Sequence, residues 1–251
     1  MNTSQTKKEM LYAQNLSKSF QELPVLEQVT LRLYENEFVS ILGPSGSGKS
    51  TIFNIISGLI PPDQGTYFIE GEESVGKLGK VSYMHQKDLL LPWRKIIDNV
   101  SMPLIIKGMD KESARNEVKK HFKTFGLEGF ENKYPFQLSG GMRQRAALLR
   151  TYMISEKIML LDEPFGALDA ITRSKMHYWL LNVVKNLNTT VLFITHDIEE
   201  AILLSDRIYV LSERPALIKD EIVIELQGER NKELITSPEF NQIKRRIMDE
   251  L

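Results

Sequence analysis

The sequence predicts an α/β fold with a largely parallel sheet. Short apolar runs alternate with helical patterns along the 251 residues, which is typical of strands joined by crossover helices. A glycine-rich loop pattern lies directly between one apolar run and one helical pattern. From about residue 88 to residue 157, the alternation gives way to helical patterns separated by prolines. We therefore expect a single domain, residues 1–251, with a mostly helical insertion at 88–157 and a polar helical tail at 227–251.

Each predicted strand is a short apolar run bounded by polar or turn residues. In chain order these runs are Leu11–Leu16, Phe38–Leu42, Tyr67–Ile69, Val81–Met84, Ile158–Leu161, Val191–Thr195 and Arg207–Leu211, followed by further edge strands within Ala216–Leu226.

The clearest helical pattern covers Ala170–Leu187, in which Leu180, Val183, Val184 and Leu187 share one face at three- and four-residue spacing. That face is expected to pack on the sheet. Prolines at positions 92, 103 and 135 separate the helical stretches of the insertion. The other expected helices begin near Lys49 or cover about Lys111–Phe125, Gly141–Ile154 and, after Pro238, Glu239–Leu251.

The composition bounds the function classes. Hydrophobic content of 42% and charged content of 26% are ordinary for a soluble globular protein with a buried core. The net charge of −1 argues against a general nucleic-acid surface, so nucleic acid is not an expected partner. The absence of cysteine excludes disulfides and thiolate sites. The polar N-terminus lacks a signal-peptide pattern, and no apolar run approaches a membrane span, so work at a membrane would require another protein as anchor.

Residues 43–51 form the strongest motif of the chain. They read Gly-Pro-Ser-Gly-Ser-Gly-Lys-Ser-Thr directly after an apolar run, which is the phosphate-binding pattern G-x-x-x-x-G-K-[ST]. Lys49 can reach the β- and γ-phosphates of a nucleotide, and the Ser50 hydroxyl can join a magnesium shell. The alternative is a glycine- and serine-rich turn that happens to match. The predicted nucleotide-binding residues are Gly43, Pro44, Ser45, Gly46, Ser47, Gly48, Lys49, Ser50 and Thr51.

The second motif is an apolar run, Ile158–Leu161, that ends in two carboxylates. Asp162 can hold a magnesium ion opposite Ser50. Glu163 is then within reach of a water molecule in line with the γ-phosphate, as a general base or water-positioning group. A strand capped by acidic turn residues is the common alternative, and the phosphate-binding loop favours the functional interpretation.

The third motif, Leu138–Arg145, reads Leu-Ser-Gly-Gly-Met-Arg-Gln-Arg. Ser-Gly-Gly at the start of a helix offers a hydroxyl and bare N–H groups to an anion, although a plain helix cap would look similar. With this motif the chain resembles the nucleotide-binding subunit of an ATP-binding-cassette (ABC) transporter. The resemblance implies a P-loop NTPase (RecA-like) core, an antiparallel β subdomain and an inserted helical subdomain. It also implies that Ser139, Gly140 and Gly141 complete the ATP site of a partner subunit.

Other family elements appear in order over nearly the whole chain. The resemblance implies that Phe20 stacks on adenine and that Gln86 contacts magnesium and the attacking water. It places Asp169, in Ala-Leu-Asp, at the dimer interface and His196 at the γ-phosphate. Two of these residues have structural alternatives: Phe20 as a core residue at a strand end, and His196 as a polar cap. The other histidines match no family element.

One departure points to a subgroup. The signature of the family most often carries Gln where this chain has Met142, and Met cannot make the same polar contacts. Met142 occurs together with Leu91-Pro92-Trp93-Arg94 and Asp98-Asn99-Val100. With these strings the chain is similar to one subgroup of the family, the importers for nitrate, sulfonates, taurine and related organic solutes, including pyrimidine precursors of thiamine. The resemblance then implies ATP and Mg²⁺ as cofactors and a homodimer with ATP between its subunits. It also implies transmembrane permease subunits, indirect work with an extracytoplasmic solute-binding protein, and a peripheral place on the cytoplasmic face of the cell membrane.

The segment Gln86–Asn99 has two interpretations. Its apolar residues Leu89, Leu90, Leu91 and Trp93 suit a groove that receives a short helix from a membrane-embedded partner, or they are buried in the core of the insertion.

Rival function classes remain open from the sequence. An exporter or lipid-extracting complex is the nearest, and a soluble cassette protein is disfavoured by the single cassette and short insertion. A P-loop kinase or GTPase does not explain Leu138–Arg145, and no guanine-reading Asn-Lys-x-Asp string occurs. Arg143, Arg145 and Arg150 could resemble a nucleic-acid stripe, but the charge balance favours a solvated or interface face.

Overall fold

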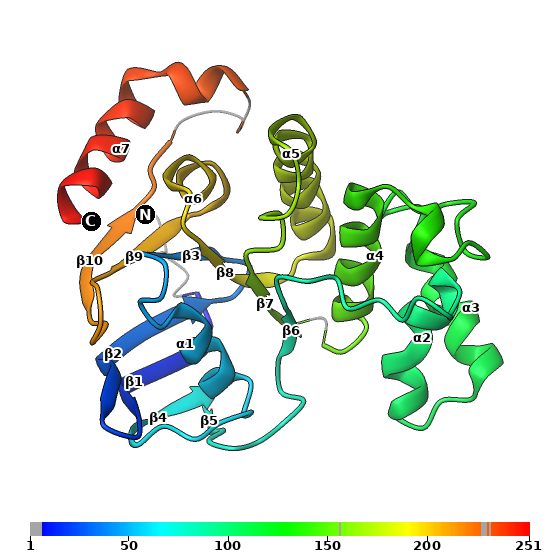
Figure 1. Ribbon diagram of the computed structural model, residues 1–251, viewed down its shortest axis with the longest axis horizontal. Coiled ribbons are helices and arrows are strands. Elements are labelled where there is room, and N and C mark those ends of the chain that lie inside the picture. Colours follow the sequence, from blue (N-terminus) through cyan, green and yellow to red (C-terminus); the bar gives the residue numbers. More distant parts are fainter. Residues whose placement is uncertain (1–6, 156, 227–229, 231) are drawn as a thin grey trace, which may run out of the picture.

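The computed structural model describes residues 7–155, 157–226, 230 and 232–251. Expectations that fall on residues 1–6, 156, 227–229 and 231 lie outside the described residues. Figure 1 shows two sheets toward the left and centre of the molecule and a helical arm that extends to the right. The predicted α/β class with largely parallel strands is confirmed.

The larger sheet has six strands in the order β10-β9-β3-β8-β7-β6. All neighbouring pairs are parallel except β10 with β9. β3, β7 and β8 are buried along their whole length, as expected for strands covered on both faces. The strands of this sheet are β3 (Phe38–Leu42), β6 (Ser82–Met84), β7 (Ile158–Asp162), β8 (Thr190–Thr195), β9 (Arg207–Leu211) and β10 (Ile218–Val223).

Alternate residues of the parallel strands pack on opposite faces of the larger sheet. Val39 and Ile41 join a core shared with α1 (Lys49–Ile56) and the smaller sheet. Phe38 and Phe193 pack on the other face with α5 (Ala170–Leu187) and the helical arm. The sheet therefore lies between α1 and α5, and the loops at its edges are left to form sites.

The smaller sheet is antiparallel, in the order β2-β1-β4-β5. Its strands are β1 (Glu9–Phe20), β2 (Leu23–Tyr34), β4 (Gln64–Ile69) and β5 (Glu72–Glu73). The sequence analysis missed β2 and β5 and ended the first strand too early. β2 carries a usable signal, because buried Val29, Leu31 and Leu33 alternate with exposed Thr30 and Arg32. A two-residue strand such as β5 is too short for any pattern.

The helical arm contains α2 (Ile96–Ile106), α3 (Lys111–Phe122), the short 3₁₀ helix η1 (Pro135–Gln137) and α4 (Gly140–Tyr152). The sequence prediction had no α2, because Pro103 was interpreted as a break, and this was wrong. Proline inside a helix costs about 3 kcal/mol or more. The burial of Ile96, Ile97 and Val100 in the core of the arm outweighs that cost.

The C-terminal part packs beside β9 and β3. It includes α6 (Ile198–Leu204), the short 3₁₀ helix η2 (Lys232–Thr236) and α7 (Pro238–Glu250). Phe240 and Ile247 bury one face of α7 in a third core with α6, whose Ala201 and Ile202 also contribute. The seven-residue α6 was not predicted, because it is too short to show a helical period. Among the described residues, no helix combines the length and the apolar character needed to cross a bilayer.

Candidate active site

Two of the three sequence motifs, the phosphate-binding loop and the carboxylates after β7, meet at one cleft. It lies at the carboxyl ends of β3 and β7, the usual ligand edge of a parallel sheet, and has a volume of about 440 Å³. The phosphate-binding loop forms one wall, and the carboxylates after β7 form another. The residues that line it are Phe20, Leu23, Val25, Ser45, Gly46, Gly48, Lys49, Ser50, Thr51, Gln86, Asp162, Glu163 and Arg214.

The backbone of the phosphate-binding loop depends on two glycines in left-handed conformations. Gly46 has φ of 80° and Gly48 has φ of 111°. A Cβ atom at Gly48 would lie 2.9 Å from side-chain atoms of both Val25 and Leu26, so the loop also needs glycine to pack against β2. α1 begins directly after Gly48, and its N-terminus therefore points the positive end of its dipole at the cleft.

Lys49 is the most buried cation of the cleft, with 5% of its surface exposed. Its Nζ donates to the carbonyl oxygens of Gly43 at 2.8 Å and Pro44 at 2.7 Å. Burial lowers the pKa of the Lys49 ammonium group, and the charges of Glu163 and Asp162 oppose that shift. An anionic ligand beside Lys49 would relieve the cost of burying its charge.

Asp162 ends β7 on the opposite wall, 9% exposed. The Tyr83 hydroxyl donates to Asp162 Oδ2 at 3.2 Å, and Ser50 forms a hydrogen bond with the same side chain. Burial raises the pKa of the Asp162 carboxyl group above its ordinary value. A buried carboxylate beside a hydroxyl group fits a hard divalent cation, because the cation would offset the desolvation of the carboxylate.

Glu163, Gln86 and His196 converge at the edge of the cleft. Glu163 Oε1 lies 3.1 Å from His196 Nδ1, and Gln86 Nε2 donates to Glu163 Oε2 at 3.3 Å. These three residues come from the ends of three neighbouring strands, β6, β7 and β8. The Glu163 backbone has φ of 42°, a left-handed conformation that is costly for a non-glycine residue. The fold therefore holds this carboxylate in place at a cost in backbone energy.

A buried network fixes the residues on both sides of His196. Thr195 Oγ1 donates to Glu200 and accepts from the Asp197 N–H at 3.0 Å. Glu200 Oε1 lies 2.8 Å from Nε2 of His177, which is on α5. His196 itself is exposed and has its Nδ1 atom at Glu163. It does more than cap its strand. His177, which the sequence analysis left as an ordinary residue, belongs to the supporting network.

Phe20 lies at the end of β1 and lines the cleft with Leu23 and Val25 of β2. The alternative that Phe20 is a core residue is wrong, because 46% of its surface is exposed. An exposed aromatic ring beside the phosphate-binding loop is free to stack on a base. The sequence analysis missed Leu23, Val25 and Arg214, because each comes from a segment without a motif.

The Ser-Gly-Gly signature lies outside this cleft. Ser139 caps α4 and accepts from the Met142 N–H at 3.3 Å. A Cβ atom at Gly140 would lie 3.2 Å from Leu168, so the start of α4 faces the loop before α5. Asp169 caps α5 by accepting from the Thr172 N–H at 2.9 Å. Within one chain, the signature and Asp169 are near each other and do not line the nucleotide cleft, although Gln86 lines both that cleft and the groove that contains Gly140.

The arginines of α4 are half-buried and make contacts within the chain, so they do not form a free basic stripe, which the sequence analysis also disfavoured. Arg143 pairs with Asp88 at 3.3 Å, and Arg150 donates to the backbone carbonyl oxygens of Asp88 and Leu89. The Arg145 guanidinium lies 4.8 Å from the centre of the Trp179 ring. These cations hold the segment after Gln86 and the helix α5 against α4.

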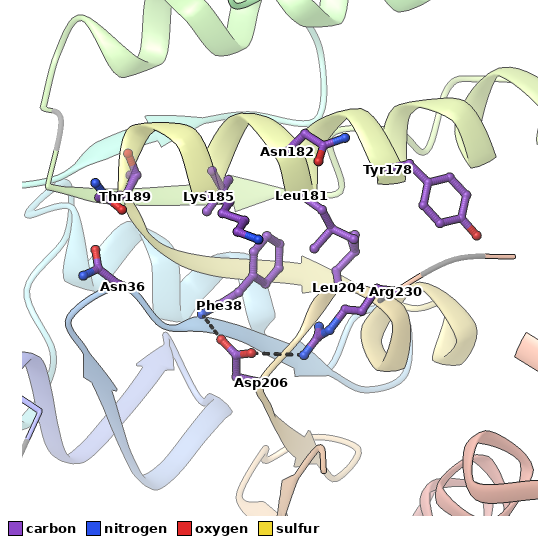
Figure 2. A pocket seen from close by; sticks show the side chains of 12 residues that line it. Asn36, Phe38, Tyr178, Leu181, Asn182, Lys185, Thr189, Leu204, Asp206 and Arg230 are labelled. Atoms are coloured by element: carbon purple, nitrogen blue, oxygen red, sulfur yellow. Dashed lines mark hydrogen bonds and ion pairs between the residues drawn. The ribbon is translucent and has the colours of Figure 1, made fainter. Parts of the chain in front are cut away.

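A second cavity, of about 570 Å³, lies at the opposite end of the strands (Figure 2). Its polar groups partly satisfy each other. Asp206 accepts from the Phe38 N–H at 3.0 Å and pairs with Arg230 at 3.0 Å, while Arg230 also donates to the Leu203 carbonyl oxygen. Burial lowers the pKa of Arg230. None of the sequence motifs lines this cavity, whereas the phosphate-binding loop and the carboxylates after β7 line the smaller cleft.

Comparison with known proteins agrees with this geometry. The family model described as ABC transporter matches residues 26–166. The formylaminopyrimidine import ATP-binding protein ThiZ of Halalkalibacterium halodurans is 48% identical over 209 residues, which cover 83% of this chain and 82% of that protein. The aliphatic sulfonates import ATP-binding protein SsuB of Bacillus cereus is 39% identical, over 93% of this chain and 91% of that protein.

A solved structure extends the likeness to three dimensions. The dimeric bacterial ABC transporter cassette MJ0796 matches with a TM-score of 0.74 at 33% identity, covering 86% of this chain and 100% of that one. The same cassette has been solved in a post-hydrolysis state bound to ADP and Pi, and that structure matches with a TM-score of 0.71. This chain therefore belongs to the ABC transporter family, as an ATP-hydrolysing subunit related to those of importers.

Proposed function

We propose that this chain works as a homodimer that hydrolyses ATP to drive uptake of a small organic or anionic solute through a membrane permease. One observation carries the proposal: Gln86, Glu163 and His196 converge at the edge of a cleft formed by the phosphate-binding loop. That arrangement suits in-line attack of water on a terminal phosphate. Residues 1–251 would act as one ATPase domain, with its helical insertion at about 88–157 and its tail at 227–251.

Each residue of the cleft then has a defined task. The N–H groups of residues 43–51 and the Lys49 ammonium group bind the phosphates, and Phe20 stacks on adenine. Ser50, Asp162 and Gln86 would hold Mg²⁺, which when bound neutralises charge on the β- and γ-phosphates. Glu163 accepts a proton from the attacking water. His196 contacts both Glu163 and the γ-phosphate and so fixes the position of one relative to the other.

The separation of the two motifs supports the dimer. Ser139, Gly140 and Gly141 at the start of α4 offer a hydroxyl and N–H groups that a second chain's γ-phosphate could bind. A two-fold axis would therefore create two complete sites, with Asp169 crossing the interface. ATP would stabilise the closed dimer by contacting both chains, and hydrolysis would remove that bridge.

The choice of an importer follows the relatives, one of which is named for formylaminopyrimidine import and another for aliphatic sulfonates import. A solute of this kind, including nitrate-like or taurine-like anions and thiamine precursors, would reach the permease from an extracytoplasmic binding protein. This subunit would sit at the cytoplasmic face of the cell membrane, held there by the permease. An exporter is not favoured, because these relatives are import proteins.

The surface for the permease is proposed at a groove of about 530 Å³ on the helical arm, lined by residues that include Trp93, Arg94 and Tyr134. Trp93 is 71% exposed, whereas its neighbour Leu90 is only 7% exposed. The segment after Gln86 therefore combines the two interpretations of the sequence: Leu90 is buried in the core of the insertion, and Trp93 is exposed at the groove. Asn99 holds the segment by donating to the carbonyl oxygens of Leu91 and Arg94, both at 3.1 Å. A rigid segment that presents an exposed tryptophan suits a docking site.

Trp93→Glu is expected to uncouple the subunit from its permease. Because Trp93 is exposed and lies outside the cleft, basal ATPase activity and the melting temperature should stay close to wild type. Loss of a central aromatic contact should weaken permease binding by about 10-fold or more. Solute uptake in reconstituted vesicles measures the effect. The matched control is Met248→Glu, 59% exposed on α7, a helix that lies on the opposite side of the molecule from α2 (Figure 1). Loss of folding in Trp93→Glu alone would contradict the docking role.

Affinity purification tests the proposed function as a whole. A tagged Glu163→Gln chain, isolated with ATP from detergent-solubilised host membranes, should recover a multi-span membrane protein, and the added change Trp93→Glu should release it. Reconstitution of the recovered membrane protein into vesicles with the wild-type chain in place of Glu163→Gln should then give ATP-dependent movement of solute toward the side that carries this subunit. Recovery of only soluble partners, ribosomes or DNA would overturn the transporter role and leave the ATPase site intact.

A further inference from the structure

Arg214 lies in the nucleotide cleft but belongs to none of the sequence motifs. It lines the same 440 Å³ space as Lys49, Ser50 and Glu163. It comes from the turn between β9 and β10, more than 160 residues after the phosphate-binding loop. The turn lies beside the loop because β9 pairs with β3 in the larger sheet.

The turn that carries Arg214 is fixed by β2. The Ala216 N–H donates to the Val25 carbonyl oxygen at 2.9 Å, and the Glu27 N–H donates to the Ala216 carbonyl oxygen at 2.9 Å. Ala216 is completely buried, and the Leu217 N–H donates to Ser212 Oγ at 3.1 Å. The backbone beside Arg214 is therefore held in place although the Arg214 side chain is exposed.

The guanidinium of Arg214 covers Gly46 of the phosphate-binding loop. Its Nε–H donates to the Gly46 carbonyl oxygen. A Cβ atom at Gly46 would lie 2.9 Å from Arg214 Nη2, so the guanidinium occupies the side where another residue would have its side chain. Three carbonyl oxygens of the loop are thus bound to cations, since Lys49 binds those of Gly43 and Pro44. Cations on these oxygens offset their repulsion of a phosphate and leave the loop N–H groups to it.

The charge of Arg214 is not neutralised by a carboxylate among the described residues. Asp162 and Glu163 line the same cleft, but they bond to Tyr83, Gln86 and His196 instead. With Nε engaged at Gly46, the two Nη groups keep donors in the forked arrangement that suits phosphate oxygens.

We propose that Arg214 is a nucleotide-binding residue that contacts the polyphosphate and holds the Gly46 peptide in its phosphate-binding orientation. This inference rests on the nucleotide site proposed above. It adds a second cation, from a different part of the chain, to the charge that Lys49 supplies. Arg214 therefore acts on the affinity for the nucleotide rather than on the rate of hydrolysis. Its contact with the phosphates exists before the chemical step and does not involve Glu163 or the water molecule.

The experiment measures dissociation constants of ADP and adenosine by calorimetry for the wild-type chain and for variants at position 214. Arg214→Ala is expected to weaken ADP binding about 10-fold or more, since a hydrogen bond to a charged group is lost. Adenosine binding should change less than twofold. Arg214→Lys should keep most of the ADP affinity. Arg214→Gln, which can still donate to Gly46 but carries no charge, should recover only the part of the affinity that depends on Gly46 and should bind ADP more weakly than Arg214→Lys. In steady-state assays, KM for ATP should rise while kcat stays within about twofold.

Lys219→Ala serves as the control, because it removes one positive charge from β10, outside the residues that line the cleft. Unchanged ADP affinity in Arg214→Ala would overturn the inference, as would full affinity in Arg214→Gln. An equal loss for adenosine and ADP would mean that the base or the fold is affected and would also overturn it. Failure of the wild-type chain to bind ADP would instead contradict the proposed function. The melting temperature of each variant tests for misfolding, which is not expected because the Arg214 side chain is exposed.

Discussion

Glu163→Gln should reduce kcat for ATP hydrolysis by about 100- to 10,000-fold, the range for loss of a general base. Gln86 Nε2 and His196 Nδ1 lie 3.3 Å and 3.1 Å from the carboxylate oxygens of Glu163. A glutamine at position 163 keeps the shape of the side chain and can still contact both residues. It cannot accept a proton from water. Nucleotide affinity should be retained, because Lys49 and the loop are unchanged.

The same variant should accumulate as an ATP-bound dimer. Without hydrolysis the γ-phosphate would continue to bridge the phosphate-binding loop of one chain and Ser139 of the other. Size-exclusion chromatography with and without ATP measures this, and phosphate release measures kcat. Glu199→Gln, a change on α6 at a carboxylate that pairs with Lys244, is the control and should behave like wild type. Turnover within about 10-fold of wild type would contradict the role of Glu163.

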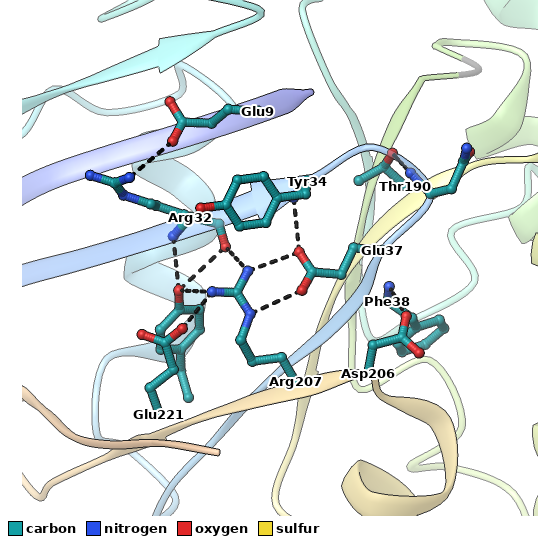
Figure 3. A network of polar contacts seen from close by, with 11 residues as sticks. Glu9, Arg32, Tyr34, Glu37, Phe38, Thr190, Asp206, Arg207 and Glu221 are labelled. Carbon is teal, nitrogen blue, oxygen red and sulfur yellow. Dashed lines mark hydrogen bonds and ion pairs between the residues drawn. The ribbon is translucent and has the colours of Figure 1, made fainter. Parts of the chain in front are cut away.

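Arg207→Ala should cost about 3–5 kcal/mol of the free energy of unfolding, because it strands a buried carboxylate. Arg207 and Glu37 are 8% and 9% exposed and pair through two bonds, Nη2 to Oε2 at 2.8 Å and Nε to Oε1 at 2.9 Å. Arg207 also pairs with Glu221 at 2.5 Å and donates to the Arg32 carbonyl oxygen at 3.0 Å (Figure 3). One guanidinium thereby joins β9, β10, β2 and the turn before β3.

The pKa directions agree with that arrangement. Burial alone would lower the pKa of Arg207, but its hydrogen bonds with Glu37 and Glu221 raise it above its ordinary value. Burial raises the pKa of Tyr209, whose hydroxyl accepts from Arg207 at 2.9 Å, to about 12. Both groups therefore keep one protonation state across the physiological range, and the network is a fixed structural joint.

Urea denaturation measures the loss. Arg246→Ala is the matched control, because it breaks a more exposed pair with Asp220 and should cost no more than about 1 kcal/mol. The double change Arg207→Met with Glu37→Met should recover part of the stability, since the stranded charge is removed with its partner. A loss below about 1 kcal/mol in Arg207→Ala would contradict the role of the joint.

The local sequence was enough to place the loop and the strands that are buried on both faces. Phe38–Leu42 is a strand with the predicted bounds, and α1 starts at Lys49 as expected. α4 begins directly after Ser139, as expected from Ser-Gly-Gly at the start of a helix. In these segments one signal dominates: a continuous apolar run, a left-handed glycine, or a capping hydroxyl. Such signals act over a few residues and can be recognised without the rest of the chain.

Other elements depend on partners far away in the sequence. Pro103 predicts a break, yet α2 continues through it because Ile97 and Val100 are buried against the arm. α6 has seven residues, and its packing partners come from β3 and α7. The exposure of Trp93 beside buried Leu90 is likewise a matter of tertiary packing. The sum of such contacts outweighs local propensity, which is worth less per residue than the burial of one large side chain.

The sequence by itself determined which chemical groups are present: a phosphate-binding loop, two carboxylates after a strand, and the Ser-Gly-Gly signature at the start of a helix. The tertiary structure decided which of them meet. Parallel order brings Gln86, Glu163 and His196 from separate strands to one edge, and sheet neighbourhood brings Arg214 over Gly46. It also keeps the signature out of that cleft. The physical reason is that a hydrogen bond or a charge acts over a few ångströms, so its partner depends on the packing of strands and helices rather than on the distance along the chain.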